Sequence, residues 1–144
     1  MHAANLILFI HLLITCYLLG MIWLVQRVHY PAFRYVDRVQ FTEFAEFHGR
    51  SISWIVAPAM LLELLTGIAL ILTHLNWLWS LNLLSILLLW CITFFWSVPC
   101  HQKLAQGFTH RAWTSLIHSN AWRTALWSLR AFALSGFVFV ELSP

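Results

Sequence analysis

Charged side chains are scarce in this chain of 144 residues. Lys, Arg, Asp and Glu together make up 9% of it, and only five residues are acidic. A soluble domain carries about 25% charged residues, so the chain lacks the polar side chains needed to cover a globule in water. The composition therefore excludes a soluble domain, a disordered chain and a charged coiled coil.

Glycine, cysteine and clustered basic residues are also few. Five glycines exclude a collagen-like chain, and the three cysteines contain no CxxC pair, which argues against a disulfide framework. The net charge of +3 does not come from a basic patch, because most of the Lys and Arg residues lie at the ends of apolar segments. We therefore expect no nucleic-acid partner.

Apolar sequence is abundant: 61% of the residues are hydrophobic, and the mean hydropathy is +0.78. Four apolar windows each reach the ~20 residues that a helix needs to cross a ~30 Å hydrocarbon core. We expect an all-α membrane protein, a single four-helix transmembrane domain over residues 1–144 that packs as an antiparallel up-down bundle. The expected spans are residues 5–28, 50–73, 77–98 and 120–142.

Prolines and one mixed segment set the boundaries between these spans. A residue before proline is disfavoured in a helix, so the first span should end before Tyr30-Pro31 and the third at Pro99. Residues 29–49 alternate charged side chains with phenylalanine and valine. That mixture predicts an amphipathic helix lying at the membrane interface.

The distribution of Lys and Arg predicts the orientation. Basic residues occur in the connectors after the first and third spans, whereas the N-terminus, the 74–76 link and the C-terminus have none. The positive-inside rule then places both connectors on the cytoplasmic side of a bacterial inner membrane, with both termini on the opposite side. The expected partners are the lipid bilayer, a hydrophobic small molecule, and either a second copy or another membrane protein.

Each expected span carries one polar stripe on an otherwise apolar helix, and in lipid these stripes should turn inward and meet. Glu63 and Arg130 lie at similar depths, ~20 Å and ~15 Å from the cytoplasmic side. We expect them to form a buried ion pair, because either charge alone is costly there. Two interpretations stay open: the pair fixes the bundle register, or Arg130 and Arg123 hold an anionic group of a ligand or cofactor.

Histidine and tryptophan supply the candidate binding residues. Eight histidines among so few charges indicate metal or haem binding, with His48 and His101 as candidate metal ligands, although a structural role is the alternative. His11 lies deep in the first span and should face the bundle interior as a ligand, a hydrogen-bonding group or a proton relay. Trp90 and Trp127 lie deeper than an interfacial belt and are placed to wall a planar ligand or to pack the core.

Three segments resemble one family. Residues 50–60, continuing to Thr66-Gly67, resemble the second helix of the HemJ-type protoporphyrinogen oxidases, and residues 103–107 resemble the run after that family's third helix. The first expected span, with His11 in its outer half, resembles that family's first helix. The resemblance implies a small helical membrane protein that binds haem b through a histidine of the first helix, here His11. The family's second ligand is a lysine of the third helix, which has no counterpart within residues 77–98.

A second resemblance rests on Tyr30-Pro31-Ala32-Phe33. This motif is similar to the Tyr-Pro-x-Phe sequence of small four-span bacterial membrane proteins that in turn resemble the fungal anthrone-oxygenase group. The resemblance implies active residues at the cytoplasmic mouth of the bundle. They are His48, Glu63, His101, Asn120 and Arg123.

The function expected from these features is that of a redox or oxygenase-type membrane enzyme. It would use haem b or a metal-assisted site, or no cofactor, and act on a hydrophobic, planar substrate. Two other classes stay open: a non-enzymatic binding or assembly factor, and a transport or proton-relay module built on Glu63, Arg130 and His11.

Reporter fusions test the expected orientation. Green fluorescent protein fused after residue 106 should fluoresce, and alkaline phosphatase fused after residue 76 should be active, because only the first site lies in the cytoplasm. The reverse pattern would contradict the topology.

Overall fold

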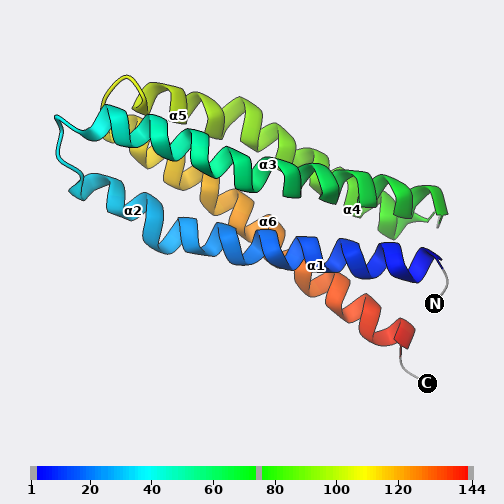
Figure 1. The fold of residues 1–144 in the computed structure, drawn as a ribbon. Helices are drawn as coiled ribbons and strands as arrows, with labels where there is room; N and C mark the ends of the chain where they lie inside the picture. The colour runs from blue at the N-terminus through cyan, green and yellow to red at the C-terminus, as the bar shows by residue number, and fades with distance from the viewer. Residues whose placement is uncertain (1–2, 74–75, 143–144) are drawn as a thin grey trace.

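The computed structural model describes residues 3–73 and 76–142, and within them the regular structure is helical. Its elements join end to end into four rods (Figure 1). The first rod consists of α1 (Ala3–Leu24), η1 (Val25–His29), α2 (Tyr30–Ala32) and η2 (Phe33–Tyr35). The others are α3 (Phe41–Thr73), the run of α4 (Trp77–Ile92), η3 (Thr93–Ser97) and α5 (Val98–Leu104), and α6 (His110–Leu142).

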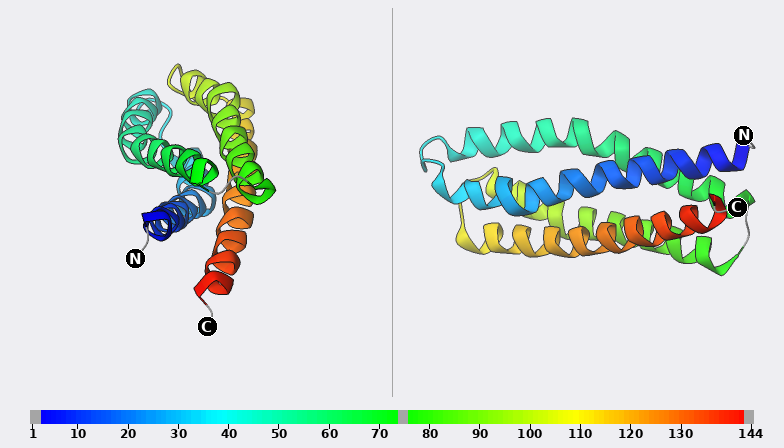
Figure 2. Two further views of the ribbon diagram at one scale, coloured as in Figure 1. Left: turned by 90° about the vertical axis from the view of Figure 1, so that its right-hand side faces the viewer. Right: turned by 90° about the horizontal axis from the view of Figure 1, so that it is seen from below.

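The rods run in alternating directions and enclose one interior. The start of α1 and the end of α6 lie at the same end of the bundle, whereas the 36–40 and 105–109 connections lie at the other (Figures 1 and 2). Both α1 and α4 contact α3 and α6. Every rod therefore contributes side chains to a shared core.

Within the described residues, three helices are long and apolar enough to cross a membrane. They cover Asn5–Tyr35, Phe41–Thr73 and Trp77–Leu104. Large apolar side chains such as Trp54, Leu72 and Phe95 are exposed on their outer faces, while polar side chains are buried. This distribution is the inverse of a water-soluble bundle and agrees with a helical membrane protein.

Two rods continue through prolines at which we expected helices to end. A proline cannot donate to the carbonyl four residues back. One extra residue before each proline forms a π-helical turn, so Tyr30 N–H donates to the carbonyl of Val25, and Val98 N–H donates to that of Thr93. The first and third rods thus extend past the expected ends at residues 28 and 98, to Tyr35 and Leu104.

The separate interfacial helix expected over residues 29–49 does not form. Its first part continues the first rod, and residues 41–49 form the opening turns of α3. Phe33, Phe41 and Ala45 from this segment are buried against α5 and α6. Phe33 and Phe41 therefore pack inside the bundle, whereas Tyr35 and Phe47 of the same segment are exposed. The helix of the fourth rod likewise begins earlier than expected, at His110 instead of residue 120.

The interior is layered along the bundle axis. An apolar cluster around Phe33, Phe41 and Leu116 lies at the end where the two connections are, and a second surrounds Leu18 and Met60. A third cluster, of Leu70, Trp79 and Leu134, lies toward the opposite end. Polar side chains occupy the interior between the second and third clusters.

Gly67 marks a close approach of α3 to its neighbours. A Cβ atom at this position would lie 2.6 Å from Ile86 Cδ1 and 3.5 Å from His11 Cε1. At Gly20, by contrast, no atom lies within 4 Å of a built Cβ. The two glycines therefore differ in available space although both lie within transmembrane-length helices.

A leucine at each glycine tests this packing. Gly67→Leu should lower the thermal midpoint in detergent, because overpacking a close contact costs about 1–3 kcal/mol. Gly20→Leu, the matched control, should leave the midpoint unchanged or raise it. Equal midpoints for the two variants would contradict the close approach.

Candidate functional site

A buried polar network links all four rods. Its charged members are Glu63 of α3 and Arg130 of α6, and its other members are neutral side chains that surround this pair. They are His11 and Thr15 of α1, Thr66 of α3, Asn82 of α4 and Trp127 of α6.

Glu63 and Arg130 form the expected ion pair. Arg130 Nη1 donates to Glu63 Oε1 at 2.5 Å, and the two side chains are only 6% and 1% exposed. Thr15 Oγ1 donates to the same carboxylate oxygen at 3.0 Å, and Trp127 Nε1 lies 3.1 and 3.2 Å from its two oxygens. The prediction is confirmed, and the carboxylate is fully partnered within the bundle.

His11 is buried and faces the interior, as predicted. Its Nε2 atom accepts from Asn82 Nδ2 at 3.1 Å and from Arg130 Nη2 at 3.3 Å. Because both of these groups are donors, the ring proton must be on Nδ1, which donates to Thr66 Oγ1 at 2.7 Å. The hydroxyl of Thr66 in turn donates to the carbonyl of Leu62 at 2.8 Å. His11 is therefore a fully bonded, neutral imidazole.

This arrangement does not fit haem ligation by His11. An axial ligand needs a ring nitrogen that is free and directed at a cavity, whereas both nitrogens of His11 have protein partners. The ring also lies outside the lining of the cavity described next. The contacts favour the interpretation of His11 as a hydrogen-bonding group.

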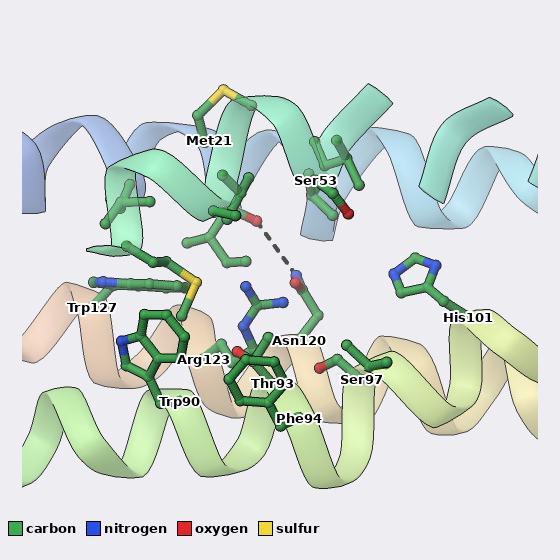
Figure 3. A pocket seen from close by; sticks show the side chains of 18 of the residues that line it. Met21, Ser53, Trp90, Thr93, Phe94, Ser97, His101, Asn120, Arg123 and Trp127 are labelled. Atoms are coloured by element: carbon green, nitrogen blue, oxygen red, sulfur yellow. Dashed lines mark hydrogen bonds between the residues drawn. The ribbon is translucent and has the colours of Figure 1, made fainter. Parts of the chain in front are cut away.

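A cavity of about 180 Å³ lies between the rods, closer to the two connections (Figure 3). Its walls are mainly apolar and include the aromatic side chains of Trp90, Phe94 and Trp127. Both π-helical turns contribute to the lining, η1 through Val25 and η3 through Phe94 and Ser97. The helical irregularities caused by the prolines thus border the cavity directly.

Arg123 is the cationic side chain of this cavity. It comes from α6, is 6% exposed, and its guanidinium extends between Trp127 and Asn120 in Figure 3. No hydrogen bond or ion pair joins it to another described residue, and its Nε atom is buried without a partner. Its ring contact is with Trp127, whose centroid lies 5.2 Å from the guanidinium carbon.

Histidine and tyrosine side chains gather at the edge of the cavity. Tyr30 Oη lies 2.9 Å from His101 Nε2, and both residues line the cavity. Behind them, His29 Nε2 and His48 Nδ1 lie 2.7 Å apart, and the rings of His48 and His101 are 5.4 Å apart. Tyr30 is held in place by Trp113, whose Nε1 donates to its carbonyl at 2.8 Å.

The histidines do not form a metal centre in this arrangement. Within residues 3–73 and 76–142, no group of three His, Cys, Asp or Glu side chains is placed to hold a metal ion. His101 Nε2 faces Tyr30, and His48 Nδ1 faces His29, so His48 Nε2 is the buried ring nitrogen left without a partner. The candidate ligands His48 and His101 therefore do not fit a metal in this geometry.

The structure divides the candidate residues between two places. Five of them line the cavity, His48 lies next to it, and three belong to the polar network alone. The cavity residues are Trp90, His101, Asn120, Arg123 and Trp127; the network residues are His11, Glu63 and Arg130. Trp127 belongs to both, since its ring walls the cavity and its Nε1 donates to Glu63.

Sequence analysis missed Tyr30 and Phe94 as site residues. Tyr30 was considered as the residue before Pro31 and as part of the Tyr-Pro-x-Phe motif, and Phe94 as part of an apolar span. Each lies in or directly after a π-helical turn that precedes a proline. A proline following a long apolar helix was the available signal, since π-helical turns occur often at functional sites.

A double-mutant cycle tests the polar network. Glu63→Gln and Arg130→Met should each lower the free energy of unfolding by about 3–5 kcal/mol, because each leaves a buried charge unpaired. The double variant should lose less than the sum of the two. Glu46→Gln, at an exposed carboxylate, is the control and should have little effect. Additive losses would contradict the pairing.

Comparison of the chain with protein-family models, curated proteins and solved structures gives no match. The resemblances to the HemJ-type oxidases and to the anthrone-oxygenase group therefore stay predictions. The geometry of the cavity and of the polar network is what supports a function for this chain.

Proposed function

We propose that the chain is a membrane enzyme of the oxygenase type that acts on a small, planar, hydrophobic substrate bound in the cavity. The observation that carries this proposal is the combination of three aromatic walls with the hydrogen-bonded pair of Tyr30 and His101 at one edge. A mostly apolar pocket with a few convergent polar groups is the usual form of a small-molecule site. Its volume of about 180 Å³ lies below the roughly 300–1,000 Å³ of most ligand sites, which favours a small ligand.

Tyr30 and His101 supply the acid–base chemistry of this proposal. Tyr30 Oη and His101 Nε2 are within hydrogen-bond distance, so the phenol proton can pass to the imidazole while the phenol oxygen accepts a proton from the substrate. The substrate anion that remains is electron-rich and is the form that dioxygen oxidises. His29 and His48 lie next to the pair: they are within hydrogen-bond distance of each other, and the His48 ring lies 5.4 Å from the His101 ring.

We propose that α6 crosses the membrane with the other three rods, so that both connections are cytoplasmic. Its arginines Arg123 and Arg130 are buried, whereas Leu129 and Phe132 are exposed on its outer face. The face presented to lipid is therefore apolar even though the helix carries internal charges. Lys103 and Arg111 lie at the end with the two connections, as the positive-inside rule requires of a cytoplasmic side.

Oxygen uptake with anthrone as the test substrate examines the proposed activity. The purified chain in detergent should consume oxygen, and His101→Phe should slow uptake at least about 100-fold, because a general base contributes about 10²–10⁴-fold. Anthrone affinity should change little, since an aromatic ring still lines the cavity. His118→Phe, at an exposed position outside the cavity, should keep the full rate.

Equal rates for the natural chain and His101→Phe would contradict the proposed role of the pair. Anthrone binding without any oxygen uptake would instead favour a non-enzymatic binding factor. An absorption spectrum and metal analysis of the same preparation report whether haem or a transition metal accompanies the activity.

A further inference from the structure

Two arginines of α6 are equally buried but differ in their surroundings. Arg123 and Arg130 are both 6% exposed and lie two helical turns apart. Arg130 donates to Glu63 and Asn82 and contacts His11. Arg123 has no hydrogen bond or ion pair with any residue that the structure describes.

The described acidic side chains offer Arg123 no counter-charge. Glu63 is bound by Arg130, Thr15 and Trp127. The others are exposed in or next to the 36–40 connection: Asp37, Glu43 and Glu46. A buried charge without a partner is strongly unfavourable. Arg123 is a buried cation that has no counter-ion among the described residues.

The space next to Arg123 is suited to an anion with an aromatic body. The guanidinium extends into the cavity, and the walls around it include Trp90, Phe94 and Trp127 (Figure 3). The cavity thus combines an unpaired guanidinium with apolar walls, and these are complementary to an acceptor group on a flat apolar molecule.

We propose that the cavity takes a small planar aromatic carboxylate whose carboxylate group pairs with Arg123. A guanidinium binds a carboxylate through two parallel hydrogen bonds, and the single charges of the two groups cancel. This inference rests on the proposed function, because it names the substrate class of the same cavity.

Calorimetric titration of the full chain in dodecyl maltoside at pH 7.4 tests the proposal with two probes. 2-Naphthoate carries the charge, whereas 2-naphthamide has nearly the same shape and is neutral. The natural chain should bind naphthoate at least about 30-fold more tightly than the amide. Arg123→Gln should remove that preference by weakening naphthoate alone, and its retained amide affinity shows that the variant is folded.

Two further variants serve as controls. Arg123→Lys keeps the positive charge but lacks the planar guanidinium, so it should recover part of the preference for naphthoate over naphthamide. Arg27→Gln removes an exposed arginine outside the cavity and should leave both affinities unchanged.

The alternative outcomes separate the two proposals. Equal binding of acid and amide by the natural chain would overturn the role of Arg123 and leave the hydrophobic site standing. Binding of neither probe would overturn both proposals. Displacement of naphthoate by phosphatidylglycerol but not by phosphatidylcholine would assign the cavity to a lipid headgroup and overturn the small-acid proposal.

Discussion

The ion pair between Glu63 and Arg130 is the interaction on which the rest of the bundle depends. A hydrocarbon environment provides no hydrogen-bond partners, so a charge inside it must be neutralised by protein. The pair joins α3 to α6, and the same groups bind His11 and Thr15 of α1 and Asn82 of α4. A shift of any rod along its axis would therefore leave a buried polar group without a partner, which fixes the register of all four.

The side chains around the cavity differ from those of the polar network in their hydrogen bonding. There, buried polar atoms of Trp90, Asn120 and Arg123 stay without partners, and two π-helical turns disturb the regular helices beside them. Unsatisfied polar groups in a native interior require an explanation, and the proposed carboxylate ligand supplies one for Arg123. Trp127 joins the two regions, because it walls the cavity with its ring and anchors Glu63 with its nitrogen. A rigid network thus supports an adjacent site that is open to a ligand.

Sequence patterns were informative about the deep interior and poor at the helix ends. The Glu63–Arg130 pair followed from matching depth and from the cost of an isolated charge, and the inward direction of His11 followed from its polar stripe. The continuation of helices through Pro31 and Pro99 could not be predicted, because the rule for residues before proline takes no account of a π-helical turn. The lack of a partner at Arg123 could not be predicted either. Arg123 and Arg130 lie seven residues apart on the same face of one helix, so the sequence pattern gives no reason to distinguish them.

The comparison of these two arginines tests the central claim most directly: Arg130 stabilises the fold, and Arg123 binds a ligand. The measurement is the free energy of unfolding of Arg130→Gln and of Arg123→Gln in the same detergent without added ligand. Arg130→Gln should lose about 3–5 kcal/mol, because Glu63 remains buried and unpaired. Arg123→Gln should be as stable as the natural chain or more stable, since it removes a charge that has no protein partner. An equal loss in both variants would show that Arg123 is also part of the structural network and would contradict this division of roles.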